Sequence, residues 1–127
     1  MKTIFSRNWN ASKKPSKQRK YIYNAPLHLV RKLMSSHLSK ELRIKHKKRS
    51  FPIRKGDTVK IMVGQFKSKI GKVNDINRHD QKVYVEGAHL LKRDGTKLPY
   101  PINASNLMIT ELNLDDKLRK KALERRN

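Results

Sequence analysis

Apolar and polar side chains alternate between residues 57 and 63, and this pattern predicts a β-strand. Val59, Ile61 and Val63 occupy every second position, and successive side chains of a strand point to opposite faces of the sheet. The pattern therefore places these three side chains in a core. Gly64 ends the strand. Gly71 falls inside the next strand, where a missing side chain predicts a bulge or the close approach of another backbone.

Similar patterns predict several more short strands. We expect them at 69–76 and 81–86, joined by a polar turn at 77–80. Residues 93–96 predict a turn between two further short strands, and alternation over 107–111 indicates a last one. Five or six short strands favour a mainly β fold with a small barrel. The positions assigned to the barrel interior are Val59, Ile61, Val63, Val73, Val83, Val85, Leu107 and Ile109.

Helical patterns flank the strands on both sides. A helix is predicted to open at Asn24-Ala25-Pro26, because proline suits the first turn and apolar residues then recur three or four apart. Ser35 and Ser36 interrupt it, and Ser39 can cap a second short helix. A third helix is predicted within 113–127, with Asp115-Asp116 at its positive end.

These elements divide the chain into four parts. Residues 1–25 are polar and basic with little apolar surface, so we expect an extended tail that is disordered in the free protein. Residues 26–50 hold short helices and a basic cluster. The barrel is expected at 51–112, and the C-terminal helix at 113–127.

The charge is far from balanced. The 127 residues include 32 Lys and Arg against 10 Asp and Glu, a formal net charge of +22. The first 50 residues contain fifteen basic side chains and one acidic side chain, so the excess is concentrated there. Such a charge opposes compaction by self-repulsion unless a polyanion neutralises it, and nucleic acid is the expected partner.

The composition argues against several other classes of protein. There is no cysteine, so disulfides and thiolate metal sites are excluded, and a reducing compartment is permitted. No apolar run approaches the roughly 20 residues of a membrane span, and the first ten residues lack a signal-peptide core. We expect a soluble, intracellular protein without a membrane partner.

Catalytic chemistry is poorly supported by the sequence. The histidine spacings match no helical or hairpin metal site, and no His, Lys or Ser completes an acid–base or nucleophilic set with Asp75, Asp80 and Glu86. Asp57 is expected to order a turn instead. We therefore expect no enzymatic activity, no metal and no cofactor.

The segment 54–73 reads RKGDTVKIMVGQFKSKIGKV and resembles the KOW motif, a hairpin of ribosomal proteins and transcription elongation factors. Ser68 stands where that family usually has glycine. The matching positions are Gly56, Asp57, Val59, Ile61, Gly64, Lys67, Gly71, Lys72 and Val73, followed by Val83, Val85, Glu86 and Gly87.

Residues 12–125 as a whole resemble the archaeal and eukaryotic form of large-subunit ribosomal protein family twenty-four. Departures from the family are His37, where proline is usual, and Asn103-Ala104, where His-Pro is usual. The resemblance implies a small SH3-like barrel with a KOW hairpin, a basic N-terminal tail and short flanking helices. It also implies a structural role on large-subunit rRNA near its 5′ region, close to the exit tunnel, in early assembly beside neighbouring ribosomal proteins. The matching segments are 23–28, 31–35, 38–43, 49–50, 52–57, 94–96, 101–102, 105–106 and 112–115.

Basic side chains in three regions are the candidates for binding rRNA. Cations that neutralise phosphates release counterions, so the affinity should depend steeply on salt. Unpaired bases can stack on Phe66, Tyr21, Tyr23 or Trp9, and for Phe66 the alternative is packing against the barrel. The candidate rRNA-binding residues are Lys13, Lys14, Lys17, Arg19, Lys20, Arg31, Lys32, Lys45, Lys47, Lys48, Arg49, Arg54, Lys55, Phe66, Lys67, Lys69 and Lys72.

The predicted function is that of a cytoplasmic structural constituent of the large ribosomal subunit, with no tendency to form homo-oligomers. The main alternative is a KOW-type transcription elongation factor, which would be expected to carry an acidic or apolar partner domain. An RNA-processing enzyme would need a catalytic cluster, and a membrane-binding protein would need an acyl or amphipathic anchor. The sequence shows none of these features.

Overall fold

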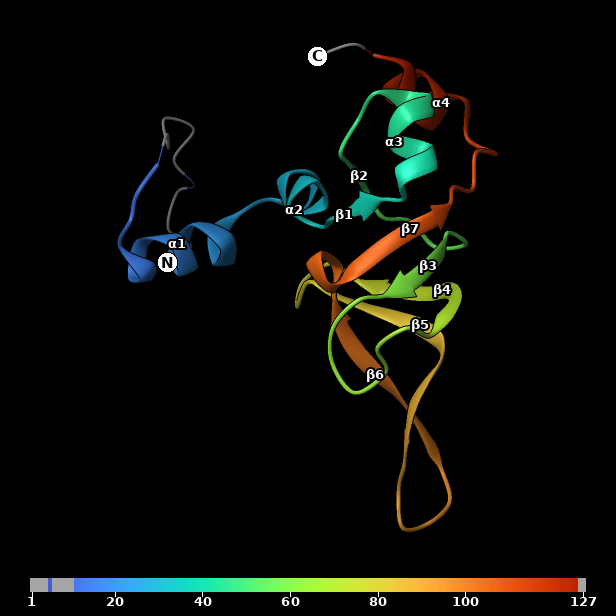
Figure 1. Ribbon diagram of the computed structural model, residues 1–127. Helices are drawn as coiled ribbons and strands as arrows, with labels where there is room; N and C mark the ends of the chain where they lie inside the picture. Colours follow the sequence, from blue (N-terminus) through green and yellow to red (C-terminus); the bar gives the residue numbers. More distant parts are fainter. Residues whose placement is uncertain (1–4, 6–10, 126–127) are drawn as a thin grey trace.

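Two helices open the described chain, and a small sheet with a long hairpin follows them (Figure 1). The computed structural model describes residue 5 and residues 11–125. The elements are α1 (Pro15–Asn24), α2 (Leu27–Leu33), β1 (Ser35–Leu38), α3 (Lys40–His46), β2 (Ser50–Pro52), β3 (Thr58–Ile61), β4 (Ile70–Asn77), β5 (Lys82–Leu91), β6 (Lys97–Asn103), the 3-10 turn η1 (Ala104–Asn106), β7 (Leu107–Glu111) and α4 (Lys117–Glu124).

The strands form one curved sheet in the order β2-β1-β7-β3-β4-β5-β6. Neighbours run antiparallel except β1 and β7, which pair in parallel with His37 opposite Met108. The last strand, β7, returns to lie between β1 and β3, with Ile109 opposite Val59. The mainly β, barrel-like fold class is thereby confirmed.

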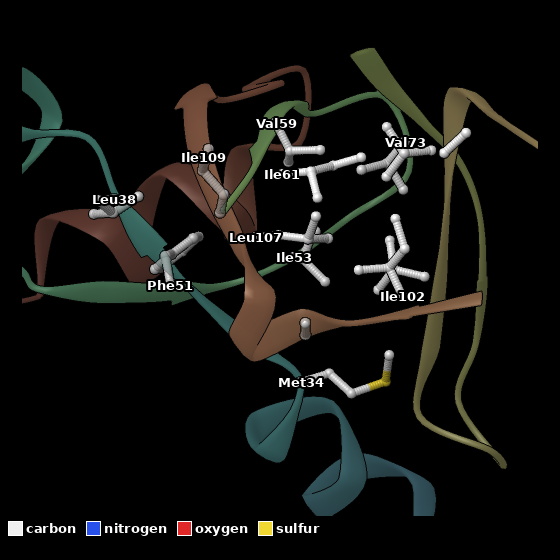
Figure 2. Packing of buried hydrophobic residues seen from close by; sticks show 14 of the residues in the cluster. Met34, Leu38, Phe51, Ile53, Val59, Ile61, Val73, Ile102, Leu107 and Ile109 are labelled. Atoms are coloured by element: carbon white, nitrogen blue, oxygen red, sulfur yellow. The ribbon is translucent and has the colours of Figure 1, made fainter. Parts of the chain in front are cut away.

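The core lies inside the curved sheet, where branched side chains meet from β3, β4, β5 and β7 (Figure 2). Seven of the eight interior positions expected from the alternation are buried. Val63 is the exception, with 59% of its surface exposed. The prediction for Val63 is wrong because β3 ends at Ile61, and the period of two has no meaning once the chain enters the loop.

The flanking segments add their own side chains to this core. Val30 of α2, Leu123 of α4 and Met34, which follows α2, are buried in the same cluster, together with Phe51 and Ile53 from the segment around β2. Burying these apolar groups stabilises the fold by about 25 cal/mol per Å² removed from water. The folded unit therefore extends well beyond residues 51–112.

Two segments differ from the conformation expected for them. Residues 15–24 form helix α1 and are not extended. Pro15 stands in its first turn and is followed by good helix formers. Residues 35–38 form β1, where the sequence predicts only an interruption of the helix. Ser36 explains this, because it is fully buried and its Oγ donates a 2.7 Å hydrogen bond to the Ala104 carbonyl.

Candidate nucleic-acid interface

The loop between β3 and β4 is held in shape by its own backbone. The Ile61 N–H donates to the Lys69 carbonyl at 2.9 Å, and the Ser68 N–H donates to the Ile61 carbonyl at 2.8 Å. A further bond of 3.1 Å runs from the Lys67 N–H to the Gly64 carbonyl. The Lys67 and Lys69 side chains are exposed on this loop. The loop therefore presents cations from a folded scaffold that loses little entropy on binding.

Ser68 adopts the left-handed backbone conformation that the KOW family usually assigns to glycine. Its φ is +72°, which costs a residue with a Cβ roughly 1–2 kcal/mol. The hydrogen bond from its N–H to Ile61 holds this conformation. Ser68 therefore adopts a backbone conformation that is usual for glycine, although it carries a Cβ.

Gly71 lies against the backbone of the neighbouring strand. A Cβ built on Gly71 would stand 2.5 Å from the carbonyl oxygen of Glu86 in β5, a separation that real Cβ atoms do not show. The predicted close approach of another backbone is confirmed. This contact brings β4 and β5 together directly after the lysine loop, and Lys72 is exposed beside it.

Phe66 turns from the loop toward the barrel. It is 8% exposed, and its ring packs edge-on against Tyr100 of β6 with the ring centroids 5.2 Å apart. The Lys69 ammonium lies 5.0 Å from the Phe66 ring centroid, a cation–π distance. The structure favours the alternative in which Phe66 packs on the barrel, because little of its ring is exposed to a base.

Some side chains of the basic cluster at 45–49 are exposed to solvent, and others pack against the rest of the protein. Lys47 caps α3 with a left-handed φ of +52°, and Lys45, Lys47 and Arg49 are exposed. Lys48 is instead tied down, because its Nζ donates to the Ala122 carbonyl of α4 at 2.7 Å. Partial burial, followed by the charges of Lys45 and Lys48, lowers the pKa of His46 below its ordinary value.

Arg54 also has a structural partner. Its Nη1 lies 2.5 Å from Oδ2 of Asp116, whose other oxygen accepts a hydrogen bond from the Leu118 N–H and so caps α4. The Arg54 hydrogen bond is the main cause of the lowered pKa of Asp116. Lys55, next in the chain, is exposed.

Helix α1 is a basic surface that stands apart from the sheet (Figure 1). None of its residues is buried, and Tyr23 near its end is 83% exposed. We call residues 11–24 the basic arm. It carries exposed cations at Lys13, Lys14, Lys17, Arg19 and Lys20. Trp9, the other aromatic candidate, lies outside the described residues.

The fold brings some of the candidate residues together and keeps others apart. Arg31, Arg54 and Lys55 line one pocket, although they come from α2 and from the loop before β3. Arg78 completes its basic side, and sequence analysis placed this residue only in a turn. The only sign in the sequence that Arg78 could contribute to a site is its position in the exposed turn that joins β4 to β5. Lys67 and Lys69 do not line this pocket.

Metal-binding clusters and membrane spans are both absent from the described residues, 5 and 11–125. These residues contain no group of three or more His, Asp or Glu side chains placed to hold a metal ion. None of the described helices is both long enough and apolar enough to cross a membrane.

Comparisons with known proteins agree over most of the chain. A family model described as the ribosomal proteins L26 of eukaryotes and L24 of archaea matches residues 12–126. The chain is 49% identical over 115 residues to the large ribosomal subunit protein uL24 of Methanosphaera stadtmanae, covering 91% of this chain and 98% of the relative. It is likewise 49% identical to uL24 of Korarchaeum cryptofilum, covering 91% and 88%. The resemblance inferred from the sequence is confirmed, and the chain belongs to the family of eukaryotic L26 and archaeal L24 ribosomal proteins.

Proposed function

We propose that the chain is held in the large ribosomal subunit by exposed cations that bind phosphates of large-subunit rRNA. One observation carries the proposal: fourteen of the seventeen candidate residues are exposed. Among the described residues, none of these fourteen takes part in an ion pair. A folded protein that leaves so many cations unpaired gains free energy when a polyanion replaces their counterions.

The family gives the setting of this role. The chain is a structural constituent of the ribosome in the cytoplasm, and its relatives are named as proteins of the large subunit. These names do not favour the alternative of a KOW-type transcription elongation factor.

Three surfaces would share the binding. The basic arm stands apart from the sheet and can follow an RNA strand (Figure 1). The exposed cations of the 45–49 cluster lie where α3 ends. The lysine loop between β3 and β4 is preformed by its backbone hydrogen bonds. Phosphate contacts of this kind fix position and orientation and carry little sequence information.

A role early in assembly, near the exit tunnel, is supported by the family resemblance together with the core. The barrel interior is closed by side chains of this chain alone, from α2 to α4. The protein can therefore present its binding surfaces to rRNA before neighbouring ribosomal proteins arrive. It should bind protein-free large-subunit rRNA that contains the 5′ region.

Sedimentation of cell extracts tests the proposal. The parent chain should migrate with large subunits and their precursors. A variant with Lys67, Lys69 and Lys72 replaced by Ala should shift toward the free fractions, while the matched variant with Arg at the three positions should stay bound. Migration of the parent with RNA polymerase, and not with large subunits, would contradict the proposal.

A further inference from the structure

A pocket of about 440 Å³ opens where α2, the loop before β3, the end of β4 and the segment before α4 meet. Its volume falls within the range of about 300–1,000 Å³ that small-molecule sites occupy. The lysine loop and the 45–49 cluster do not contribute to it. The pocket is therefore a feature separate from the surfaces described above.

The pocket combines an apolar floor with a charged rim. Met34 and Ile53 line it and are 3% and 5% exposed, and Ile76 is partly buried beside them. A flat, apolar group can rest on such a floor. The remaining lining is charged except for Asn113, and it includes the cations Arg31, Lys55 and Arg78 and the carboxylates Asp75 and Asp115.

These rim groups are available to a ligand. All five are exposed, and among the described residues none of their side chains forms a hydrogen bond or an ion pair. The walls around them are fixed, because Arg54 is bonded to Asp116 and Arg119 is buried in an ion pair with Asp57. The pocket thus offers free cations and free carboxylates on a rigid frame.

We propose that this pocket takes one unpaired nucleotide of the rRNA, with its base on the Met34, Ile53 and Ile76 floor and its phosphate against Arg31 and Arg78. The proposal rests on the proposed function and names a specific contact within it. Arg guanidinium groups match phosphate oxygens in geometry as well as charge. Single-stranded RNA is recognised in this way, by splayed bases whose edges are hydrogen-bonded.

The carboxylates at the rim restrict which base fits. Asp75 and Asp115 can only accept hydrogen bonds when ionised. Adenine, cytosine and guanine present an amino group to such an acceptor, as carboxylates accept from the N4 amino group of cytosine in known complexes. Uracil has no amino group, and its single donor on that edge, N3–H, lies between two carbonyl oxygens that the carboxylates repel. The pocket should therefore prefer amino-bearing bases to uracil.

Nucleotide titrations of the full chain, followed by backbone amide NMR shifts, test the inference. Adenosine 5′-monophosphate should move the amides around Ile76, Arg78 and Asn113 in a saturable way, and uridine 5′-monophosphate should bind at least several-fold more weakly. Arg78→Ala should weaken adenosine monophosphate binding about tenfold, the effect of losing one charge-assisted hydrogen bond. Arg93→Ala, the same charge change in the exposed turn after β5, should have no effect. Asp75→Asn should reduce the preference over uracil, because an amide can also donate.

The outcomes separate this inference from the function on which it rests. Equal binding of adenosine and uridine monophosphates, or the same shifts with inorganic phosphate alone, would overturn it. So would the absence of saturable shifts while a large-subunit rRNA fragment still binds the same sample, and in that case the proposed function would stand. If the rRNA fragment also failed to bind, both would fall.

Chemical probing of assembled subunits tests whether the nucleotide belongs to rRNA. Dimethyl sulfate modifies the pairing edges of adenine and cytosine, and kethoxal modifies that of guanine, so the two reagents together report on every amino-bearing base. With the parent chain, one unpaired base should be protected, and the Arg78→Ala chain should expose it while Arg93→Ala should not. Identical reactivity in all three subunits would contradict an rRNA occupant.

Discussion

Arg119 and Asp57 face each other across the interior of the protein and form two parallel hydrogen bonds, Nη1 to Oδ1 and Nη2 to Oδ2, both 2.6 Å long. Both side chains are almost fully buried, at 2% and 0% exposure. Asp57 also accepts the N–H groups of Arg54 and Asn113. Arg119 donates to the carbonyls of Asn113 and Pro52. The pair therefore connects α4 to Arg54, which precedes β3, and to Asn113, which follows β7.

Removing Arg119 should unfold much of the protein. Arg119→Met leaves the Asp57 carboxylate buried without its cation, which typically costs about 3–5 kcal/mol. Leu118→Ala is the matched control, because Leu118 is on the same helix but 74% exposed. Urea unfolding should show a large loss for Arg119→Met and a change within about 0.5 kcal/mol for the control. Similar midpoints for the two variants would show that the pair is not a main support of α4.

Replacing Ile61 tests the end of β3. Ile61 is 1% exposed and Val63, two residues on, is 59% exposed. Ile61→Ala should cost about 2–5 kcal/mol through reduced burial and the cavity left behind, whereas Val63→Ala should change the stability little. A bound rRNA fragment should raise the melting temperature of Ile61→Ala, since a ligand at one hundred times its Kd adds about 2.7 kcal/mol. A comparable loss of stability for Val63→Ala would show that the strand extends to residue 63, as the sequence pattern predicts.

Ser68→Gly should stabilise the free protein. Glycine removes the roughly 1–2 kcal/mol cost of the left-handed conformation but loses about 0.4–1 kcal/mol through the more flexible unfolded chain. The expected net gain is about 0.5 kcal/mol. Gln65→Gly, in the same exposed loop and without a positive φ, should be destabilising. An equal decrease in melting temperature for the two substitutions would contradict this account of the loop.

Acid should loosen the start of α4. The pKa of Asp116 is lowered in the folded protein, first by the hydrogen bond from Arg54. A carboxyl group with a depressed folded pKa contributes stability above its unfolded pKa, near 3.8, and that contribution is lost as pH falls through the folded value. As the pH is lowered from about 5 through the unfolded pKa and below it, melting temperatures of the parent should therefore drop more than those of Asp116→Asn. Parallel pH profiles would show that the ion pair is not coupled to folding.

The strand pattern was predictable from the sequence because it is local. The alternation of apolar and polar residues predicted that Val59 and Ile61 are buried, and a glycine at position 71 inside a strand predicted a close backbone contact. The Arg119 partner of Asp57 could not be inferred, because the two residues are 62 apart in sequence and a basic residue on a charged helix gives no sign of burial.

The candidate interface was predictable in composition more than in geometry. Charge counting found the arm, the cluster and the loop, but it could not separate exposed Lys47 from Lys48, which bonds to Ala122. The helical state of residues 15–24 was missed because a polar, basic run gives no apolar periodicity. The grouping of Arg31 with Arg78 depends on how α2 lies against the β4–β5 turn, which only the fold reveals.

The salt dependence of rRNA binding tests the central claim most directly. The equilibrium constant of the full chain for protein-free large-subunit rRNA should fall linearly with salt on logarithmic axes. Replacing Lys67, Lys69 and Lys72 by Ala should lower the slope by about 0.7–0.9 for each phosphate that the variant no longer neutralises, while the matched Arg variant keeps the parent slope. An Ala variant with the parent slope would contradict the claim that these lysines bind phosphate.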